Sequence, residues 1–379
     1  MQSTTIEKEN TAALRGELIR GKENIEKLNH DWDKLFEKAN DAAPFLSRAW
    51  TQTFINEEHY SGIPGLIVVW NKKELAALLP LSIQKIYGIH IGKPIGIEQP
   101  SYLGFLINPE FPNAASVAAE TWIREKVGQV FLDKHVFSQD MATQKFVEEL
   151  KKRGFNFKYG YERVSHGIEL GCTFDEYFEK YKSSKSRQTI RRKERKLLSE
   201  NDVKLEYYEG KEITEEILDR ISHIQNESWM KRRGAAILGQ PFYKKLLNNM
   251  AQAGLACIWL MTIDKEDAAF VYALKSHGKL NYHWPAFKLK YESGLSIGQI
   301  LLMQIIRDAC EQNIKYFDFE HGEGEYKRFW ANHTNKVLWV VAGRGLAGNI
   351  IILYYRLAWF LAGQKRLWSL YQRIKAAGK

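Results

Sequence analysis

Apolar and polar positions follow a strand, loop, helix, strand order through residues 281–330. An aromatic and apolar strand, LNYHW, leads into a loop that carries Pro285, Gly294 and Gly298. The stretch IGQILLMQIIRDACEQ then places apolar side chains widely around the helical turn, which predicts a well-buried helix. A second strand, IKYFDF, follows a short gap and ends in a polar, acidic turn. This is the pattern of an α/β unit.

The first turn of the predicted helix is a candidate anion site. Helix N-termini present unpaired N–H groups and the positive end of the helix dipole. Because glycine lets the backbone approach a ligand closely, we expect this turn to bind the phosphates of a cofactor. The residues assigned to it are Ser296, Ile297, Gly298 and Gln299. The second strand then places Asp318, Glu320 and His321 above it.

The rest of the chain divides at changes in this pattern. Charged, helix-favouring residues predict a helical extension over 1–43, without an apolar run of the signal-peptide kind. A first α/β domain is expected over 44–165, with the strands GLIVVWN and ELAALLPLSIQ joined by an NKKE hairpin turn. The alternation of strand and helix recurs over 166–341, which predicts a second domain of the same kind.

Composition narrows the choice of partners. The 379 residues are 45% hydrophobic, enough to form the cores of two domains. A net charge of +10 favours an anionic partner such as a nucleotide cofactor, a charged glycan, a membrane surface or nucleic acid. Three scattered cysteines without CxxC spacing predict reduced thiols, no metal site and a cytoplasmic location.

The densest basic run lies over residues 182–196. One interpretation is a solvated helix with a basic face. The other places Arg187, Arg191 and Arg192 on an anionic substrate, because a guanidinium binds phosphate bidentately. Trp229 and the KRRG sequence after it have the same two interpretations, packing or substrate contact.

The C-terminal segment 342–379 is predicted to be a basic amphipathic helix. Its apolar run is interrupted by Arg356 and is too short to span a bilayer. Interfacial Trp and Tyr residues between basic ones fit an in-plane, peripheral membrane anchor. Packing on the protein's own domains is the other interpretation, and both remain open.

Two stretches, PAFKLKYESGLSIGQILL and KYFDFEHGEGEYKRFW, resemble the second domain of GNAT acyltransferases of the CelD/BcsL type, relatives of the FemAB aminoacyl transferases. The shared spacing is carried by Asp318, Phe319, Gly322, Tyr326 and Lys327. The resemblance extends over residues 44–330. In one departure, Ser296-Ile297-Gly298 stands where relatives often have a Ser-Pro-Gly type turn.

The resemblance implies an α/β (α+β) fold of two tandem GNAT-like domains. Each would be a mixed, mostly antiparallel sheet flanked by helices, with helical extensions at both ends. It also implies no permanently bound cofactor, and acetyl-CoA or another acyl-CoA as co-substrate. The acyl group would pass directly, in a ternary complex, to an amino or hydroxyl group of a sugar or lipid-linked precursor in exopolysaccharide or cell-envelope synthesis.

Such a reaction needs a base and a stabiliser of the departing thiolate. The candidates for the base are His283, Glu320, His321 and Glu323. Tyr326 or Lys327 could donate a proton to the thiolate or hold charge, with Asp318 assigned to the same catalytic group. Gly322 and Glu323 of the acidic turn are assigned to substrate binding.

Two alternatives remain. The first is a FemAB-like transferase that takes an amino acid from aminoacyl-tRNA. The basic run favours it, although the chain lacks the long helical arm of several of those relatives. The second is a non-catalytic scaffold or binding protein of a glycan-assembly complex.

Overall fold

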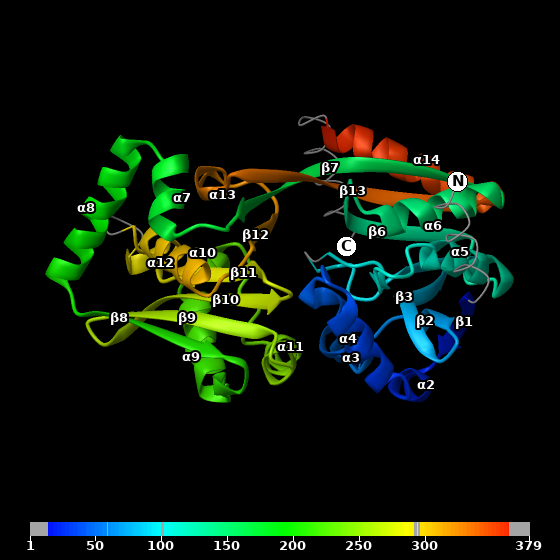
Figure 1. The fold of residues 1–379 in the computed structure, drawn as a ribbon, viewed down its shortest axis with the longest axis horizontal. Helices are drawn as coiled ribbons and strands as arrows, with labels where there is room; N and C mark the ends of the chain where they lie inside the picture. The colour runs from blue at the N-terminus through cyan, green and yellow to red at the C-terminus, as the bar shows by residue number, and fades with distance from the viewer. Residues whose placement is uncertain (1–13, 59, 100–101, 292–293, 295, 364–379) are drawn as a thin grey trace. The chain divides into compact units, whose positions relative to one another are not determined.

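The computed structural model describes residues 14–58, 60–99, 102–291, 294 and 296–363 (Figure 1). The chain forms two compact units: unit 1 comprises Met1–Arg163 and Lys336–Lys379, and unit 2 comprises Val164–Asn335. It leaves unit 1 within β7 (Phe155–Glu169) and returns within β13 (His333–Arg344). Residues 336–341, assigned from sequence to the second domain, therefore group with unit 1.

Unit 1 is built on a sheet with the strand order β1-β2-β3-β4-β6-β13-β7. The new strands are β1 (Leu14–Arg20), β2 (Ile63–Asn71), β3 (Glu74–Ile86), β4 (Ile89–Pro94) and β6 (Val130–Phe137), and the short β5 (Leu106–Ile107) pairs with β3. Helices α5 (Ala114–Arg124) and α6 (Met141–Lys152) pack on one face; α2 (Lys22–Glu26), α3 (Asn29–Lys38) and α4 (Arg48–Ile55) pack on the other.

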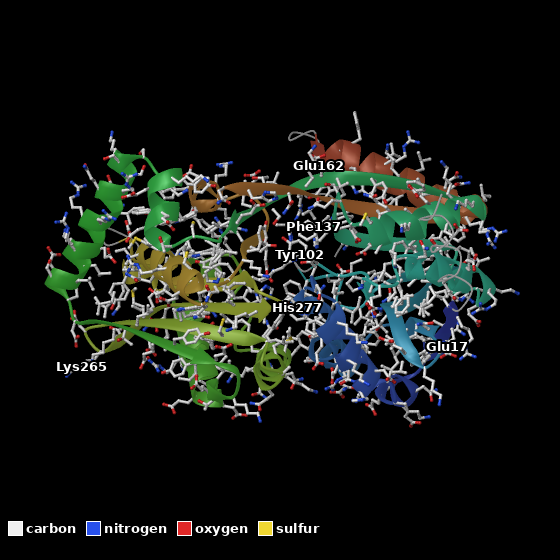
Figure 2. All side chains as sticks on the ribbon, in the orientation of Figure 1. Glu17, Tyr102, Phe137, Glu162, Lys265 and His277 are labelled. Atoms are coloured by element: carbon white, nitrogen blue, oxygen red, sulfur yellow. The ribbon has the colours of Figure 1, made fainter. Side chains whose placement is uncertain are left out.

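Alternation along β2 shows why both faces of this sheet are covered. Ile67 and Val69 join the core beneath α5 and α6, whereas Leu66 and Val68 join the core beneath α3 and α4. Successive strand residues point to opposite faces, so an uninterrupted apolar run requires cover on both. Aromatic pairs complete the packing, as between Tyr102 and Phe137, whose ring centroids lie 4.3 Å apart (Figure 2).

The prediction of a wholly helical N-terminal extension was wrong for residues 14–20. These residues form β1, which pairs antiparallel with β2 from Leu14 opposite Asn71 to Arg20 opposite Gly65. Their charged residues favour a helix locally, but backbone hydrogen bonds to the edge of β2 make this segment a strand. Helices α2 and α3 follow as expected. Residues 1–13 lie outside the described residues.

Unit 2 is built on a sheet with the strand order β7-β12-β11-β10-β9-β8. The strands are β8 (Val203–Glu209), β9 (Ala256–Ile263), β10 (Glu266–Ser276), β11 (Lys279–Phe287) and β12 (Tyr316–His321). One core contains side chains of α7 (Phe174–Tyr181), α8 (Ser184–Glu200), α12 (Ile297–Glu311) and α13 (Glu325–Trp330). On the opposite face lie α9 (Glu215–Asn226) and α11 (Pro241–Gln252) (Figure 1). The short α10 (Trp229–Arg232) contacts α9 and β11.

The two units repeat one plan. In unit 1, α5 connects the parallel pair β4 and β6; in unit 2, α12 connects the parallel pair β11 and β12. The pairs β1–β2, β2–β3, β3–β4, β6–β13, β7–β12, β8–β9, β9–β10 and β10–β11 are antiparallel. The predicted fold class, a mixed and mostly antiparallel sheet flanked by helices in each of two tandem domains, is confirmed.

The repetition extends to a matched bulge. In β6, Asp133 is followed two positions later by His135 with φ of 60°; in β12, Asp318 is followed two positions later by Glu320 with φ of 59°. Each strand places two residues opposite one at this point, which is the signature of a β-bulge. Left-handed backbone is uncommon for residues with a Cβ, so its recurrence marks a shared feature of the two units.

The C-terminal helix α14 (Gly345–Gly363) belongs to unit 1. It begins at Gly345, not at the predicted 342, because β13 continues to Arg344 and pairs with β6 over residues 337–343. The basic residues predicted for the end of this helix, 364–379, lie outside the described residues. Within the described residues, no helix is both long and apolar enough to cross a membrane.

Candidate functional site

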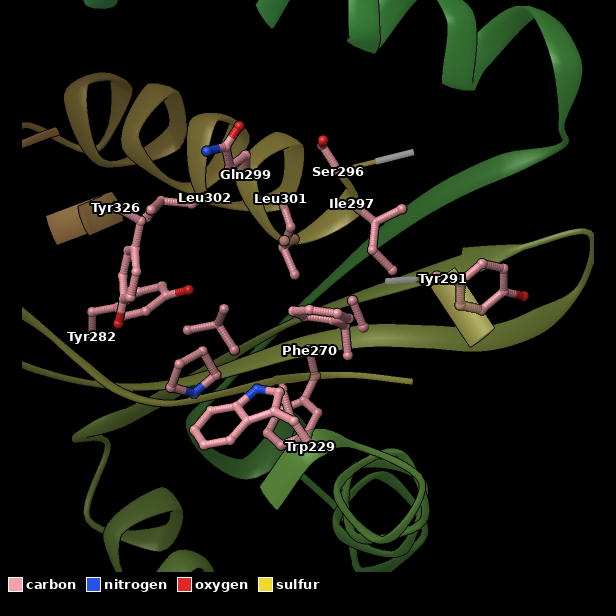
Figure 3. Close-up of a pocket in the computed structure, with 16 residues that line it drawn as sticks. Trp229, Phe270, Tyr282, Tyr291, Ser296, Ile297, Gln299, Leu301, Leu302 and Tyr326 are labelled. Atoms are coloured by element: carbon pink, nitrogen blue, oxygen red, sulfur yellow. The ribbon is translucent and has the colours of Figure 1, made fainter. Parts of the chain in front are cut away.

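Strands β11 and β12 pair only over residues 279–281 and 316–318. Beside the unpaired part of β11, unit 2 holds a pocket of about 320 Å³ (Figure 3). Residues from β10, β11, α10, α12 and α13 line it, so segments far apart in the sequence meet there. Its walls are predominantly apolar and aromatic, as in most small-molecule sites.

The first turn of α12 forms one end of this pocket. Ser296, Ile297, Gly298 and Gln299, the four residues assigned to a cofactor, all line it. Ser296 adopts the left-handed conformation at the helix N-cap, with φ of 52°. A Cβ at Gly298 would lie 3.2 Å from the Phe287 ring, so glycine keeps this turn close to β11. The structure therefore brings the predicted anion site to a cavity.

Lys193 of α8 reaches this helix start. Its Nζ donates to Ser296 Oγ at 2.8 Å, adding a positive charge beside the N-terminus of α12. Lys193 is not among the site residues predicted from the sequence. Ile190 and Leu197, both buried, identify the inner face of α8, and Lys193 lies between them at helical spacing. That spacing was the signal that could have found it.

Aromatic residues form the other walls. Trp229 starts α10 and lines the pocket, with the Arg233 guanidinium 5.0 Å from its ring centroid. Helix α9 ends at Asn226 and Ser228 caps α10, so Trp229 opens a short helix of its own. Tyr282 and Tyr326 stand together at the far side, their ring centroids 6.3 Å apart (Figure 3).

Next to Tyr282 along β11 is a buried polar pair. His283 Nδ1 lies 2.7 Å from Glu320 Oε1, and the two side chains are 1% and 6% exposed. Asp318 Oδ1 accepts hydrogen bonds from Ser165 Oγ at 3.0 Å and from the Glu320 N–H at 2.7 Å. Asp318 thus holds the bulge that orients Glu320 toward His283. No group of metal-ligating side chains occurs within the described residues.

The turn after β12 supplies two more titratable groups. Burial, and then the charge of Glu320, raises the pKa of Tyr326 to about 12, so its phenol stays protonated at neutral pH. Burial lowers the pKa of Lys327 below its usual range, against the opposing effect of Glu320, Asp318 and Glu323. Lys327 Nζ donates to the carbonyl oxygens of Glu320 and His321 at 3.4 and 3.3 Å, which holds the turn.

Of the predicted catalytic residues, Tyr326 lines the pocket, whereas His283, Asp318, Glu320 and Lys327 lie outside its lining. The remaining predicted residues also lie outside it. Gly322 takes φ of 112° in the turn, and Glu323 pairs with Arg328 at 2.9 Å. His321 is half-buried at the end of β12. On the basic run, Arg187 donates to the carbonyl oxygens of Glu179 and Lys182, Arg191 pairs with Asp175, and Arg192 is exposed. The structure does not bring these three arginines to the pocket.

Comparison with known proteins gives the same kind of fold. Residues 184–328 match the family model described as an acetyltransferase (GNAT) domain. No curated protein matches the sequence significantly. The crystal structure of FemX is similar with a TM-score of 0.59 at 12% identity, covering 85% of this chain and 96% of that one.

A second structure is the C-terminal domain of a proposed lysylphosphatidylglycerol synthetase from Agrobacterium fabrum. It is similar with a TM-score of 0.54 at 10% identity, covering 87% of this chain and 95% of that one. These matches do not distinguish the CelD/BcsL type from other branches. The residues that match the acetyltransferase (GNAT) domain model, 184–328, all lie within unit 2.

Proposed function

We propose that the protein is an acyltransferase that takes its acyl group from acetyl-CoA or another acyl-CoA bound in the unit 2 pocket. The observation that carries the proposal is the first turn of α12 at one end of the pocket, with Lys193 beside it. Helix N–H groups and a lysine ammonium together suit a pyrophosphate. The apolar walls suit the uncharged arm that joins the phosphates to the thioester.

The buried polar pair supplies the base. The acceptor's amine or hydroxyl attacks the thioester carbonyl and its proton passes to the His283–Glu320 pair, which a hydrogen bond of 2.7 Å holds in place. The carbon–sulfur bond then breaks. The departing thiolate takes a proton from Tyr326, whose raised pKa keeps its phenol protonated. Glu323 is the less suitable base, because it is exposed and paired with Arg328.

The acceptor is an amino or hydroxyl group on a sugar or lipid-linked precursor of exopolysaccharide or the cell envelope. A net charge of +10 favours an anionic acceptor of this class. Since GNAT domains generally depend on acyl-CoA, the reaction needs no permanently bound cofactor. We propose direct transfer in a ternary complex, as the resemblance to GNAT acyltransferases implies.

A FemAB-like transferase using aminoacyl-tRNA is the second candidate. One observation favours it: the outer side of α8 exposes Arg191, Arg192, Arg195 and Lys196, a surface suited to a phosphate backbone. FemX, which shares the fold, carries the name of that group.

Thermal unfolding in the presence of acetyl-CoA, longer acyl-CoAs, free CoA and bulk tRNA separates the candidates. A ligand that binds the native state raises the unfolding midpoint by mass action. The proposal predicts a rise with acyl-CoA that Gly298→Leu abolishes. No rise with any CoA species, together with a salt-sensitive rise with tRNA, would instead support the aminoacyl-tRNA candidate.

A further inference from the structure

Helix α14 carries apolar side chains on two opposite faces. The inner face packs on unit 1: Ile352 is buried, and Tyr355 lies against Trp339 with ring centroids 6.2 Å apart. Trp359 covers Gly160, where a Cβ would come within 2.1 Å of its ring. The start of the helix passes close to Gly343. This face is therefore fully used in anchoring α14 to its own unit.

The opposite face is apolar and exposed. Its large side chains are between 53% and 81% exposed. They are Leu346, Ile350, Leu353, Tyr354, Leu357 and Phe360. At 3.6 residues per turn they fall within an arc of roughly 120° on the helix surface. Elsewhere in the described chain, exposed large apolar residues do not form such a stripe on one helix. A contiguous apolar patch of this kind marks an interaction surface.

Charge identifies the kind of partner. Within α14 the only charged residue is Arg356, which is exposed beside the apolar stripe. The chain then continues as QKRLWSLYQRIKAAGK, which has five Lys and Arg residues and no Asp or Glu. An apolar helix face, followed in sequence by a segment whose charged residues are all basic, suits an anionic lipid bilayer. The apolar face suits the acyl chains, and the basic residues suit the negative headgroups.

We propose that the outer face of α14 docks the protein in the plane of an anionic membrane surface. The six apolar side chains enter the boundary between headgroups and acyl chains, and the positive charge of the sequence that follows favours anionic headgroups. A second copy of the chain would carry the same five Lys and Arg residues after this helix, so like charges would oppose a dimer through this face. This inference is independent of the proposed acyltransferase activity.

Vesicle flotation of the full chain tests the proposal. Binding is expected to phosphatidylcholine vesicles that contain phosphatidylserine, to weaken as salt is raised, and to be far weaker with phosphatidylcholine alone. The double variant Leu353→Ser, Leu357→Ser should lower the partition coefficient at least about tenfold, because two exposed apolar anchors are lost. Lys365→Gln with Arg366→Gln should weaken binding to the anionic vesicles specifically.

Leu198→Ser is the matched control. Leu198 is 55% exposed on α8 of unit 2, like Leu353 and Leu357 at 53% and 56% on α14. It should leave vesicle binding unchanged. If the double variant lowers the unfolding midpoint, Ile350→Ser replaces it. No binding to anionic vesicles, or equal binding by the double variant, would overturn the proposal. So would a wild-type dimer in sedimentation that the double variant converts to a monomer, because the face would then join two copies.

Discussion

The carboxylate of Glu320 meets the imidazole of His283 at 2.7 Å, two residues beyond the last pair that joins their strands. The parallel pairing of β11 with β12 ends at Asn281 and Asp318. The register between β10 and β11 shifts where Tyr272 and Ala273 stand opposite Trp284 and Tyr282, and a bulge displaces Glu320 on β12. Two irregularities on neighbouring strands thus bring an acid and a base together.

Glu320→Gln should lower the rate of CoA release in the transfer reaction by about a hundredfold or more. The reason is that the His283–Glu320 pair, the proposed general base, loses its carboxylate charge. Binding of acyl-CoA, measured by the rise in unfolding midpoint, should stay the same. Glu323→Gln should change neither quantity greatly, since that carboxylate is exposed. Loss of activity in Glu323→Gln but not in Glu320→Gln would reverse the assignment of the base. Full cellular function of Glu320→Gln would favour the scaffold interpretation.

Gly298 variants test the place of the cofactor. The Cβ of an alanine would lie 3.2 Å from the Phe287 ring, tight enough to require a small shift. Gly298→Ala should therefore weaken acyl-CoA binding modestly, and Gly298→Leu should abolish the rise in unfolding midpoint. Calorimetric titration of both variants with free CoA measures how much affinity each substitution removes. Unaltered affinity in Gly298→Leu would place the cofactor elsewhere.

Lys193→Gln should weaken binding of acyl-CoA by about tenfold, the effect expected from loss of one charge-assisted hydrogen bond of about 1–2 kcal/mol. Lys196→Gln is the comparison, because Lys196 is exposed on the same helix and pairs only loosely with Glu200 at 3.9 Å. If both variants bind acyl-CoA equally weakly, the loss comes from the overall positive charge of α8 and not from the contact of Lys193 with α12. Raising the salt concentration should narrow the difference from wild type.

The alkaline side of the pH profile distinguishes the two candidate proton donors. Tyr326 has a pKa raised to about 12, so a reaction that relies on its proton keeps its rate until the pH approaches that value. Burial lowers the pKa of Lys327 below 10.5, so a reaction that relies on Lys327 slows earlier. We expect the late decline, and a lower kcat in Tyr326→Phe. An earlier decline of the rate that Lys327→Met removes would assign the proton to lysine.

Asp133 in unit 1 should make stability depend on pH. Its side chain is fully buried, and Oδ2 has no hydrogen-bond partner within the described residues. Burial, and then the charge of Asp140, raises the pKa of Asp133 well above its usual range. The native state therefore holds a proton that the unfolded chain releases near pH 4, and the free energy of unfolding falls as the pH rises above that value.

Asp133→Asn should remove this fall and stabilise the protein at pH 7 by about 1–3 kcal/mol relative to wild type. Urea unfolding of both proteins between pH 4.5 and 8 measures the slope. Equal slopes would show that Asp133 is ionised in the native protein with a charge partner. The matched bulge at Asp318 differs, because Asp318 accepts a hydrogen bond from Ser165.

The arrangement around α12 was the most predictable part of the site. Ser296 to Gln299 follow a glycine-bearing loop and open a strongly apolar helix, so sequence alone located the turn that lines the pocket. The arginines of α8 were harder. Arg187 donates to the backbone carbonyl of Lys182, between α7 and α8. The face of α8 that meets α12 depends on which of its residues are buried. That information exists only once α8 and α12 pack together.

The buried polar pair and strand β1 were beyond prediction for a similar reason. His283 was one of four candidates for the base, and only the irregular pairing of β11 and β12, which leaves no mark in residue periodicity, selects Glu320 as its partner. Residues 14–20 carry enough charge to suggest a helix, and only the free edge of β2 makes them a strand.

The return of the chain into unit 1 through β13 has a consequence for folding during synthesis. Strand β6 pairs with β4 on one side, but its other partner is made only after all of unit 2. The ribosome therefore releases every strand of unit 2 while β6 still has an open edge, a state prone to wrong pairing. Unit 2 can complete its sheet first, and unit 1 remains the half of the nascent chain that needs protection longest.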